Sequence, residues 1–487
     1  MHRISRREFL DNAFSAASLA ALSPALLPGR ARAEDAPAAG GKRSGPNGRV
    51  RVATIGVHGQ GSSHVEQLAD LADVEVAVIC DVDPGAISGA MNSVEKKTGK
   101  RPAYVQDLRK LFEDKSIDAV TIATPNHWHA LAALWAMQAG KDVYVEKPVC
   151  HNVREGRRLV EAAAKYGRIA QAGTQRRSMP SMQEAIAYLR SGKLGKVKIA
   201  RALCYKLRPS IGKAAAPAAI PAGLDYDLWC GPAPAAPPMR LKFHYDWHWF
   251  WDYGNGDIGN QGVHEMDLAR WGLGVDELPR SAVSVGGRYS YEDDGQTPNT
   301  QLSFLDWGGP RIVFEVRGLK CPQFQGAGVG DVFHCEKGWM VSDSYTYAAA
   351  FDPDGNRIAE FKGAADRFRP FIDAVKARDP KLLTCPIREN HLSAGCCHLA
   401  NASYRLGEVK PFDPASKPFG DDAVAVETFD RMREHLAAYD VKLEKAGLRF
   451  GRPLTIDPKT ETVVGDPQAD AMLGREYRKG FEVPAKI

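Results

Sequence analysis

The alternation of strand-like and helical segments between residues 50 and 173 constrains the fold of this 487-residue chain more than any other feature. The segments follow one another as strand 50–57, helix 63–71, strand 75–81, helix 86–98, strand 119–123, helix 129–139, strand 142–146, helix 153–166 and strand 169–173. Strands that alternate with helices of this length form right-handed βαβ units around a parallel sheet. The pattern therefore predicts a doubly wound α/β domain that ends near residue 173.

The pattern changes after residue 173, because Gly, Pro, Asn and Asp now separate the strand-like segments instead of crossover helices. These segments cover residues 196–206, 282–291, 300–306, 311–317, 332–336 and 338–342. Such a series predicts a large antiparallel sheet with one face covered. Helical periodicity recurs at 182–191, 366–377, 389–406 and 423–446, whereas the last 40 residues show little periodicity. A second, α+β domain with an open sheet is the prediction.

The N-terminus has the three parts of an export signal. Adjacent Arg6 and Arg7 precede an uncharged run at 13–27, which is followed by Ala31-Arg32-Ala33. A basic region, a short apolar run and a small-residue cleavage site predict a signal peptide over residues 1–33. The paired arginines before Phe9-Leu10 resemble a twin-arginine signal, so we expect a periplasmic or otherwise exported protein. Residues 34–48 are rich in Ala, Gly and Pro and are predicted to be a linker.

Charge and cysteine usage exclude several classes. The formal charge of +5 falls to +2 if residues 1–33 are removed. So weak a balance excludes a nucleic-acid partner, which would need clustered Lys and Arg. No later segment has the roughly 20 consecutive apolar residues of a membrane helix, so no membrane contact is expected after cleavage. The nine cysteines are odd in number and widely spaced, which is not the pattern of a disulfide framework.

The turn after the first predicted strand has the spacing of a dinucleotide-binding loop. Gly56 and Gly61 stand at the outer glycine positions of G-x-G-x-x-G, but His58 stands at the middle one. Either the loop would tilt or Gly59 would take over the close approach to a pyrophosphate. Asp81 ends the next strand and would accept the ribose hydroxyls, which favours NAD over NADP. The alternative is a doubly wound domain with an incidental glycine turn. The predicted cofactor contacts here are Gly56, His58, Gly59, Gln60, Gly61 and Asp81.

Further motifs carry a resemblance to a known family. They are T-P-N-H-W-H at 124–129, E-K-P at 146–148, G-L-D-Y-D-L-W-C-G-P at 223–232 and an aromatic run at 245–253. With the glycine turn, they resemble the glucose-fructose oxidoreductase, inositol dehydrogenase and MocA (Gfo/Idh/MocA) family over residues 49–410, and its exported bacterial members in particular. The resemblance implies cofactor contacts at Thr124, Pro125, Asn126, His129, Glu146 and Lys147.

The same resemblance implies how the chain is organised. It implies a Rossmann domain at 49–173 that binds NAD(P), and a substrate-binding α+β domain at 174–410 whose open antiparallel sheet joins subunits of a homo-oligomer. The substrate would be a sugar or polyol. Residues 411–487 are expected to form an extension that packs on the surface.

Two motifs supply the expected catalytic residues. Lys147 matches the lysine of E-K-P, where an ammonium beside the nicotinamide can bind a substrate hydroxyl and relay its proton. In the family the bond after this lysine is often cis. His264 matches the general base of the family's D-x-G-x-H pattern, but Asn260 stands where an Asp is common. An amide cannot accept a proton, so Asp257 is a substitute if the turn brings it inward.

Substrate contacts are predicted with open alternatives. Trp251 belongs to an aromatic run that suits stacking on a sugar, or simple core packing. Arg176 matches a family segment near the substrate but is also compatible with a surface position, and Asp267 matches the family motif that follows the histidine. The histidines at 127, 129, 244, 248 and 264 lack the spacing of a metal site, so no metal is expected.

Three functions remain open from the sequence. The leading hypothesis is an exported oxidoreductase that moves hydride between a sugar-ring carbon and NAD and keeps its cofactor tightly bound, because free NAD is not expected outside the cytoplasm. The second is an NAD-dependent glycosidase or lyase that acts by transient 3-keto oxidation and elimination, which Asn260 favours. The third is a silent sugar-binding protein, which His58 suggests.

Overall fold

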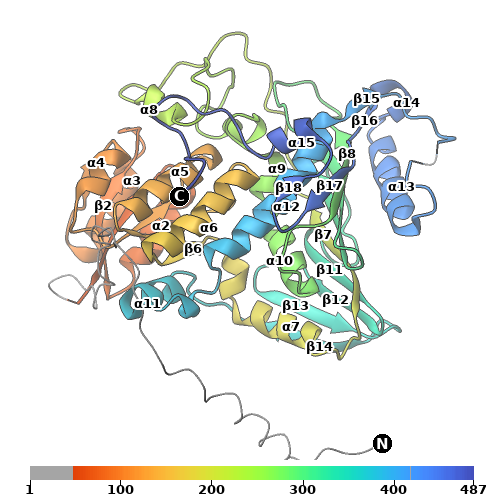
Figure 1. Ribbon diagram of the computed structural model, residues 1–487, viewed down its shortest axis with the longest axis horizontal. Coiled ribbons are helices and arrows are strands. Elements are labelled where there is room, and N and C mark those ends of the chain that lie inside the picture. Colours follow the sequence, from red (N-terminus) through yellow and green to blue (C-terminus); the bar gives the residue numbers. More distant parts are fainter. Residues whose placement is uncertain (1–47, 417) are drawn as a thin grey trace, which may run out of the picture. The chain divides into compact units, whose positions relative to one another are not determined.

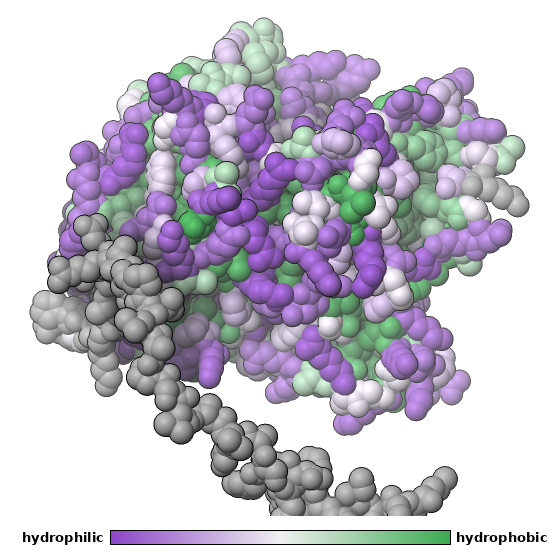
Figure 2. All heavy atoms as spheres, viewed as in Figure 1, coloured by the Kyte–Doolittle hydropathy of each residue, from purple (hydrophilic) through white to green (hydrophobic). Residues whose placement is uncertain are grey.

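The computed structural model describes residues 48–416 and 418–487 (Figure 1). The predicted signal peptide and the predicted linker up to residue 47 lie outside the described residues. Within the described ranges, no helix has the length and apolar character needed to cross a membrane. Polar side chains are spread over the face in Figure 2, and apolar ones lie among them in small groups.

The first domain contains the predicted doubly wound parallel sheet, whose six strands run in the order β3-β2-β1-β4-β5-β6. The strands are β1 (Val50–Ile55), β2 (Val74–Cys80), β3 (Ala103–Val105), β4 (Ala119–Ile122), β5 (Asp142–Val145) and β6 (Ala170–Ala172). The helices are α2 (Gln60–Ala69), α3 (Ser88–Thr98), α4 (Leu108–Glu113), α5 (Asn126–Gln138) and α6 (Val153–Tyr166). The strand order reverses between β1 and β4, and sheets of this kind bind ligands at that point.

Burial and caps explain these elements. All four residues of β4 and all four of β5 are buried, as expected for apolar strands covered on both faces. Helix α6 begins where the Asn152 side chain accepts a hydrogen bond from the Glu155 N–H, and it ends at left-handed Gly167. Strand β3 and helix α4 escaped sequence analysis, since three to six residues are too few to show a period.

The second domain contains a sheet of 12 strands, of which ten run in the order β14-β13-β12-β11-β7-β10-β9-β8-β16-β15 while β17 and β18 lie off this path. The strands are β7 (Val197–Cys204), β8 (Ser281–Gly287), β9 (Thr300–Asp306), β10 (Arg311–Arg317), β11 (Val329–Cys335), β12 (Gly338–Ser342), β13 (Tyr347–Phe351), β14 (Arg357–Lys362), β15 (Glu408–Lys410), β16 (Leu448–Phe450), β17 (Leu454–Asp457) and β18 (Thr462–Val463). The large sheet that sequence analysis predicted is confirmed, with one difference. Strands β7 and β10 run parallel, because β7 reaches the sheet from the first domain and a long excursion separates the two.

The chain after residue 173 also contains helices. They are α7 (Pro180–Arg190), α8 (Tyr226–Cys230), α9 (Gly256–Asn260), α10 (Val263–Leu273), α11 (Arg369–Ala377), α12 (Ile387–Leu406), α13 (Ala423–Ala437), α14 (Leu443–Ala446) and α15 (Pro467–Ala471), with short 3-10 turns at Gln175–Ser178, Asp246–Trp249 and Pro380–Leu382. On β8, Ser284 contacts Ser403 of α12, whereas its neighbour Val285 packs with Phe429 of α13. Successive strand residues point to opposite faces, so α12 and α13 cover opposite sides. Figure 1 shows α12 beside α6.

The C-terminal region differs from its sequence-based interpretation in two ways. The helix predicted over 423–446 is two helices, because Asp440 lies between them in the left-handed region at φ 58°. The last residues also do more than cover the surface, since β16 and β17 both pair with β8. Strands of three and four residues leave no periodicity in a sequence.

Candidate active site

A cavity of about 670 Å³ lies at the carboxyl ends of β1, β2, β4 and β5, and the second domain completes its wall. The predicted residues that line it are Gly56, His58, Gly59, Gln60, Asp81, Thr124, Pro125, Asn126, His129, Glu146, Lys147, Asn260 and His264. Gly61, Arg176, Trp251, Asp257 and Asp267 are absent from the lining. The structure thus brings the two predicted catalytic motifs together with the dinucleotide-binding turn.

The glycine turn has the shape that a pyrophosphate needs. Gly56 lies in the left-handed region at φ 81°, and a Cβ there would be 2.9 Å from the Thr124 nitrogen. At Gly61 a Cβ would be 1.7 Å from the Gly56 carbonyl oxygen, so Gly61 packs beneath the turn. Gly59 is exposed and a Cβ there would meet nothing within 4 Å. A ligand therefore has access to the turn at Gly59 and to the first N–H groups of α2.

His58 and Asp81 form the adenosine side of the cavity. The exposed imidazole of His58 stacks on His244, with ring centroids 4.2 Å apart. Asp81 accepts hydrogen bonds from the N–H groups of Val57 at 2.8 Å and Asp83 at 3.0 Å. These bonds fix the carboxyl at the end of β2, where it lines the cavity. The turn, the helix N-terminus and the acid fit a dinucleotide.

Glu146 is a buried carboxylate in a polar network. His64 Nε2 lies 2.9 Å from its Oε1, and Gln175 Nε2 lies 3.4 Å away. Burial raises the pKa of Glu146, but the hydrogen bond with His64 and the charges of Lys147 and Arg367 outweigh it and lower the pKa to about 2. Burial also lowers the pKa of His64, so we assign a neutral imidazole that donates to an ionised Glu146.

Lys147 follows β5, and its peptide bond to Pro148 is cis, as the family resemblance implied. Its Nζ donates a hydrogen bond to the backbone oxygen of Asn260 at 2.9 Å. Burial lowers the pKa of Lys147, and the positive charges of Lys206 and Arg208 lower it further. The negative charge of Glu146 opposes them and raises it. An ammonium whose pKa is lowered gives up its proton more easily near neutral pH.

His264 begins the second side of the reaction centre, in the first turn of α10. Its ring lies 5.1 Å from that of Tyr345, and its Nδ1 has no hydrogen-bond partner among the described residues. Burial lowers the pKa of His264 well below 6.5, and Lys147 and Arg176 lower it further. The imidazole is therefore neutral and able to accept a proton. Asn260 also lines the cavity, and its backbone oxygen accepts the hydrogen bond from Lys147.

Asp257 is buried outside the cavity lining. Both of its oxygens accept hydrogen bonds from the Arg208 guanidinium, at 2.6 to 3.0 Å. The turn therefore does not bring this carboxylate to the cavity as a replacement for an acid at position 260. It holds Arg208, which does line the cavity.

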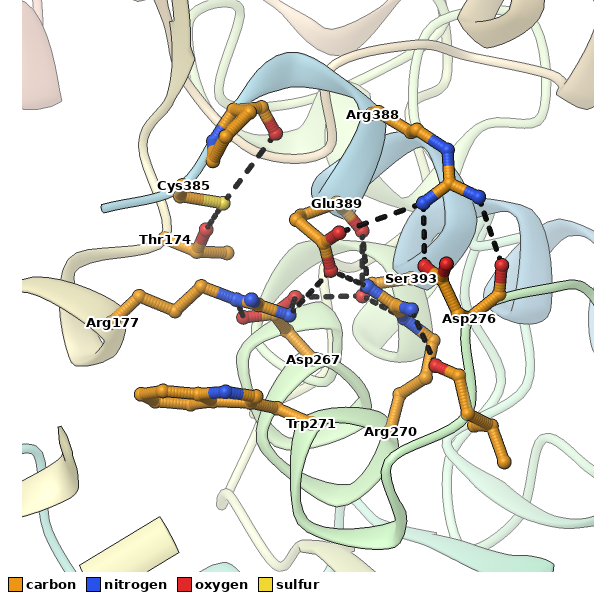
Figure 3. A network of polar contacts seen from close by, with 12 residues as sticks. Thr174, Arg177, Asp267, Arg270, Trp271, Asp276, Cys385, Arg388, Glu389 and Ser393 are labelled. Atoms are coloured by element: carbon orange, nitrogen blue, oxygen red, sulfur yellow. Dashed lines mark hydrogen bonds and ion pairs between the residues drawn. The ribbon is translucent and has the colours of Figure 1, made fainter. Parts of the chain in front are cut away.

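The three predicted substrate contacts are also engaged elsewhere. Arg176 is 1% exposed and forms ion pairs with Glu265 and Asp331, both at 3.0 Å. Asp267 accepts two hydrogen bonds from Arg177 and one from Ser393, within the network shown in Figure 3. Trp251 stacks against the guanidinium of Arg405. Arg176 and Asp267 thus connect α10 with neighbouring elements, Trp251 packs on α12, and none of the three lines the cavity.

Several lining residues were not among the predicted site residues. The polar ones are Ser63, Gln106, Gln175, Lys206, Arg208, His244, Tyr245, His248, Gln261, Tyr345 and Arg367. Lys206 and Arg208 are two positions apart just beyond β7, so an extended chain points both to the same side. That spacing was a usable signal. The others reach the cavity from segments far apart in the sequence, which no local pattern reveals. His127 and His129 contact backbone carbonyl oxygens.

Comparisons with known proteins agree with this architecture. A Gfo/Idh/MocA model described as an oxidoreductase family with an NAD-binding Rossmann fold matches residues 50–174. A second, described as the C-terminal alpha/beta domain of the oxidoreductase family, matches residues 189–438.

Curated relatives match over a shorter stretch. A glycosyl hydrolase family 109 protein of Shewanella baltica is 37% identical over 172 residues, and an alpha-N-acetylgalactosaminidase of Shewanella oneidensis is 36% identical over 172 residues. In both cases the match covers 34% of this chain and 38% of the relative, so it spans well under half of the relative's length.

Solved structures share the fold. The WlbA dehydrogenase of Bordetella pertussis, in complex with NADH and UDP-GlcNAcA, is 22% identical with a TM-score of 0.51, over 71% of this chain and 93% of that one. Levoglucosan dehydrogenase, in complex with NADH and levoglucosan, is 17% identical with a TM-score of 0.54, over 72% and 95%.

Proposed function

Because the chain belongs to the Gfo/Idh/MocA oxidoreductase family, we propose that it is an exported NAD-dependent enzyme that acts at a ring carbon of a sugar, polyol or glycoside. The observation that carries this proposal is the approach of Lys147 to Asn260 across the cavity, with neutral His264 in the same wall. The glycine turn lies in the same cavity. A binding site for a cofactor and a proton-handling group thus share one space.

The cofactor assignment rests on the fit of the residues. The turn at Gly56–Gly61 and the start of α2 would hold the pyrophosphate, and Asp81 would accept the hydroxyls of the adenosine ribose. A carboxylate in that position repels a 2′-phosphate, which favours NAD over NADP. Bound NAD supplies reversible hydride transfer at a sugar carbon.

The protein side chains handle the hydroxyl proton. Lys147 donates a hydrogen bond to the substrate oxygen and orients it, and its lowered pKa suits proton exchange. His264 accepts the proton as a neutral base. Asn260 orients the substrate or the imidazole through its amide, which can donate and accept hydrogen bonds but cannot take the proton.

A second candidate is redox-neutral glycoside cleavage. In that reaction transient oxidation at C3 acidifies the adjacent C–H, and a base removes this proton as the aglycone leaves with the electron pair. Asn260 in place of an acid favours this candidate, as do the glycosyl hydrolase family 109 relatives. His264 would be the base.

Export supports tight retention of the cofactor. The twin-arginine pattern at the N-terminus would carry the folded protein out of the cytoplasm. Outside the cytoplasm, free NAD is not available to replace a lost molecule. A silent sugar-binding protein, the third candidate, would have no need to retain NAD.

One experiment separates these functions. The secreted or periplasmic protein is purified and denatured, and the released dinucleotide is measured by chromatography. We expect about one NAD per chain; its absence refutes both enzymatic candidates. The holoprotein is then incubated with nitrophenyl glycosides, and separately with free sugars and an electron acceptor. Nitrophenolate without net NADH indicates elimination, whereas a keto sugar without bond cleavage indicates a dehydrogenase.

A further inference from the structure

The wall of the cavity near Lys147 carries an excess of positive charge. Lys147, Lys206 and Arg208 all line the cavity, and both neighbours lower the pKa of Lys147. Among the described residues, neither lysine has a carboxylate within ion-pair distance. Lys147 donates to the backbone oxygen of Asn260, and Lys206 donates to the amide oxygen of Gln261 at 2.9 Å.

The nearby carboxylates neutralise this group only in part. Asp257 pairs with Arg208. Glu146 stays ionised beside Lys147, because its partners His64 and Gln175 are neutral, and its charge offsets part of that of Lys147. Glu265 is fully buried behind the wall, paired with Arg176, and the Gln261 amide stands between it and Lys206, donating to Glu265 at 3.3 Å. Among the described residues, the half-buried ammonium of Lys206 therefore faces the cavity without a paired carboxylate.

This cluster lies away from the phosphate-binding turn. The predicted adenosine contact Asp81 ends β2, and the turn follows β1, whereas Lys147 follows β5. With strands about 4.8 Å apart in the order β2-β1-β4-β5, Lys147 is roughly 14 Å across the sheet from Asp81. Lys206 and Arg208 come from the second domain and contact Gln261 and Asp257, which flank Asn260. The cations thus surround the substrate end of the cavity.

We propose that the substrate is an acidic sugar, whose carboxylate or sulfate group is bound by Lys206 and Arg208 while Lys147 binds the reacting hydroxyl. This inference rests on the proposed function, because it names the class of sugar that the same site accepts. A carboxylate offers two oxygens, and a sulfate ester three, that share a negative charge and accept hydrogen bonds from an ammonium and a guanidinium. Charge-assisted hydrogen bonds of this kind are stronger than hydrogen bonds between neutral groups. The neutral ring of His248, whose pKa burial lowers to about 3, adds no further charge to this wall.

The test measures binding by isothermal titration of the NAD-containing protein. Matched sugars form the panel: glucose, glucuronate and glucose 6-sulfate, and galactose, galacturonate and galactose 6-sulfate. We expect at least one acidic member to bind about tenfold more tightly than its neutral partner, and the carboxylate and sulfate arms tell which acid is preferred. A panel in which no acidic sugar binds more tightly than its neutral partner overturns the inference.

Two variants locate the effect. Lys206→Met should bring the ratio of acidic to neutral affinity close to one, and Lys206→Arg should restore part of it. Lys198→Met is the matched control, since Lys198 is an exposed lysine of β7, the strand that precedes Lys206, and lies outside the cavity; it should keep the wild-type ratio. Arg208 is left intact because its loss would leave Asp257 buried without a partner. An unchanged ratio in Lys206→Met refutes the assignment.

The NAD content of each sample separates this inference from the proposed function. Wild-type protein without NAD contradicts the proposed function, whatever the sugars do. Wild-type protein with NAD but without a preference for acidic sugars contradicts only the inference. Loss of NAD from Lys206→Met, with the control intact, means that the lysine serves the cofactor and overturns its assignment to the substrate.

Discussion

Gly61→Ala tests whether the glycine turn has the geometry described above. Gly61 is the second residue of α2, and an added Cβ would lie 1.7 Å from the Gly56 carbonyl oxygen. An ordinary contact needs about 3.4 Å, so helix and turn would have to move apart by well over 1 Å. Overpacking of this kind costs about 1–3 kcal/mol. Neither the new Cβ nor the Gly56 carbonyl oxygen can rotate away, because the backbone fixes the position of both.

Gly89→Ala is the matched control. Gly89 is the second residue of α3, and a Cβ there meets nothing within 4 Å. An alanine in a helix is favoured over glycine by up to about 1 kcal/mol, so this variant should be as stable as wild type or slightly more so. The two variants should therefore differ by about 1–4 kcal/mol in the free energy of unfolding, although the chemical change is identical.

Thermal unfolding of NAD-stripped protein measures the difference. At ~2–4 °C per kcal/mol for a large domain, the midpoint of Gly61→Ala should lie on the order of 2–15 °C below that of Gly89→Ala. The same displacement of the turn should lower the amount of NAD that copurifies with Gly61→Ala. Equal midpoints and equal NAD content in the two variants would falsify the close contact between α2 and the turn.

Three further predictions concern the charged residues. Lys147→Ala should abolish turnover in a spectrophotometric assay and leave the NAD content unchanged, and residual activity above a few per cent would remove Lys147 from its proposed role. Burial raises the pKa of Glu461, but its hydrogen bonds with His391 and Arg157 lower it from 4.5 to about 2. Because its folded-state pKa is depressed, its stabilising effect is present above pH 4.5 and is lost as the pH falls toward 2; urea unfolding of Glu461→Gln should vary less with pH in that window than that of wild type. Asp267→Asn should lower the unfolding midpoint by several degrees without changing sugar affinity, since its carboxylate binds Arg177 and Ser393 outside the cavity; an affinity loss at unchanged stability would return Asp267 to the substrate site.

The sequence predicted long periodic elements well. Of the charged side chains, Asp81, Glu146 and Lys147 line the cavity as predicted, whereas Arg176, Asp257 and Asp267 do not. Helix α6 and strands β9, β10 and β12 have the predicted bounds, because each repeats its pattern over five residues or more. Arg176 and Asp267 were interpreted as substrate contacts, yet both meet counter-charges from other elements inside the fold. A motif indicates which residue type occurs, whereas the partner of a buried charge depends on segments that are distant in the chain. Lys206 was missed although its spacing from Arg208 beyond β7 was a usable local signal.

The amide at position 260 changes the charge of the reaction centre but not the position of Lys147. Lys147 contacts the backbone oxygen of Asn260, so its position does not depend on the side chain at 260. A carboxylate at that position would raise the pKa of Lys147, whereas the amide leaves Lys206, Arg208 and burial to lower it. The substitution therefore makes the lysine easier to deprotonate and leaves neutral His264 as the proton acceptor in this wall. It also adds no negative charge to the substrate end, so Lys206 keeps a charge there that an acidic sugar would neutralise.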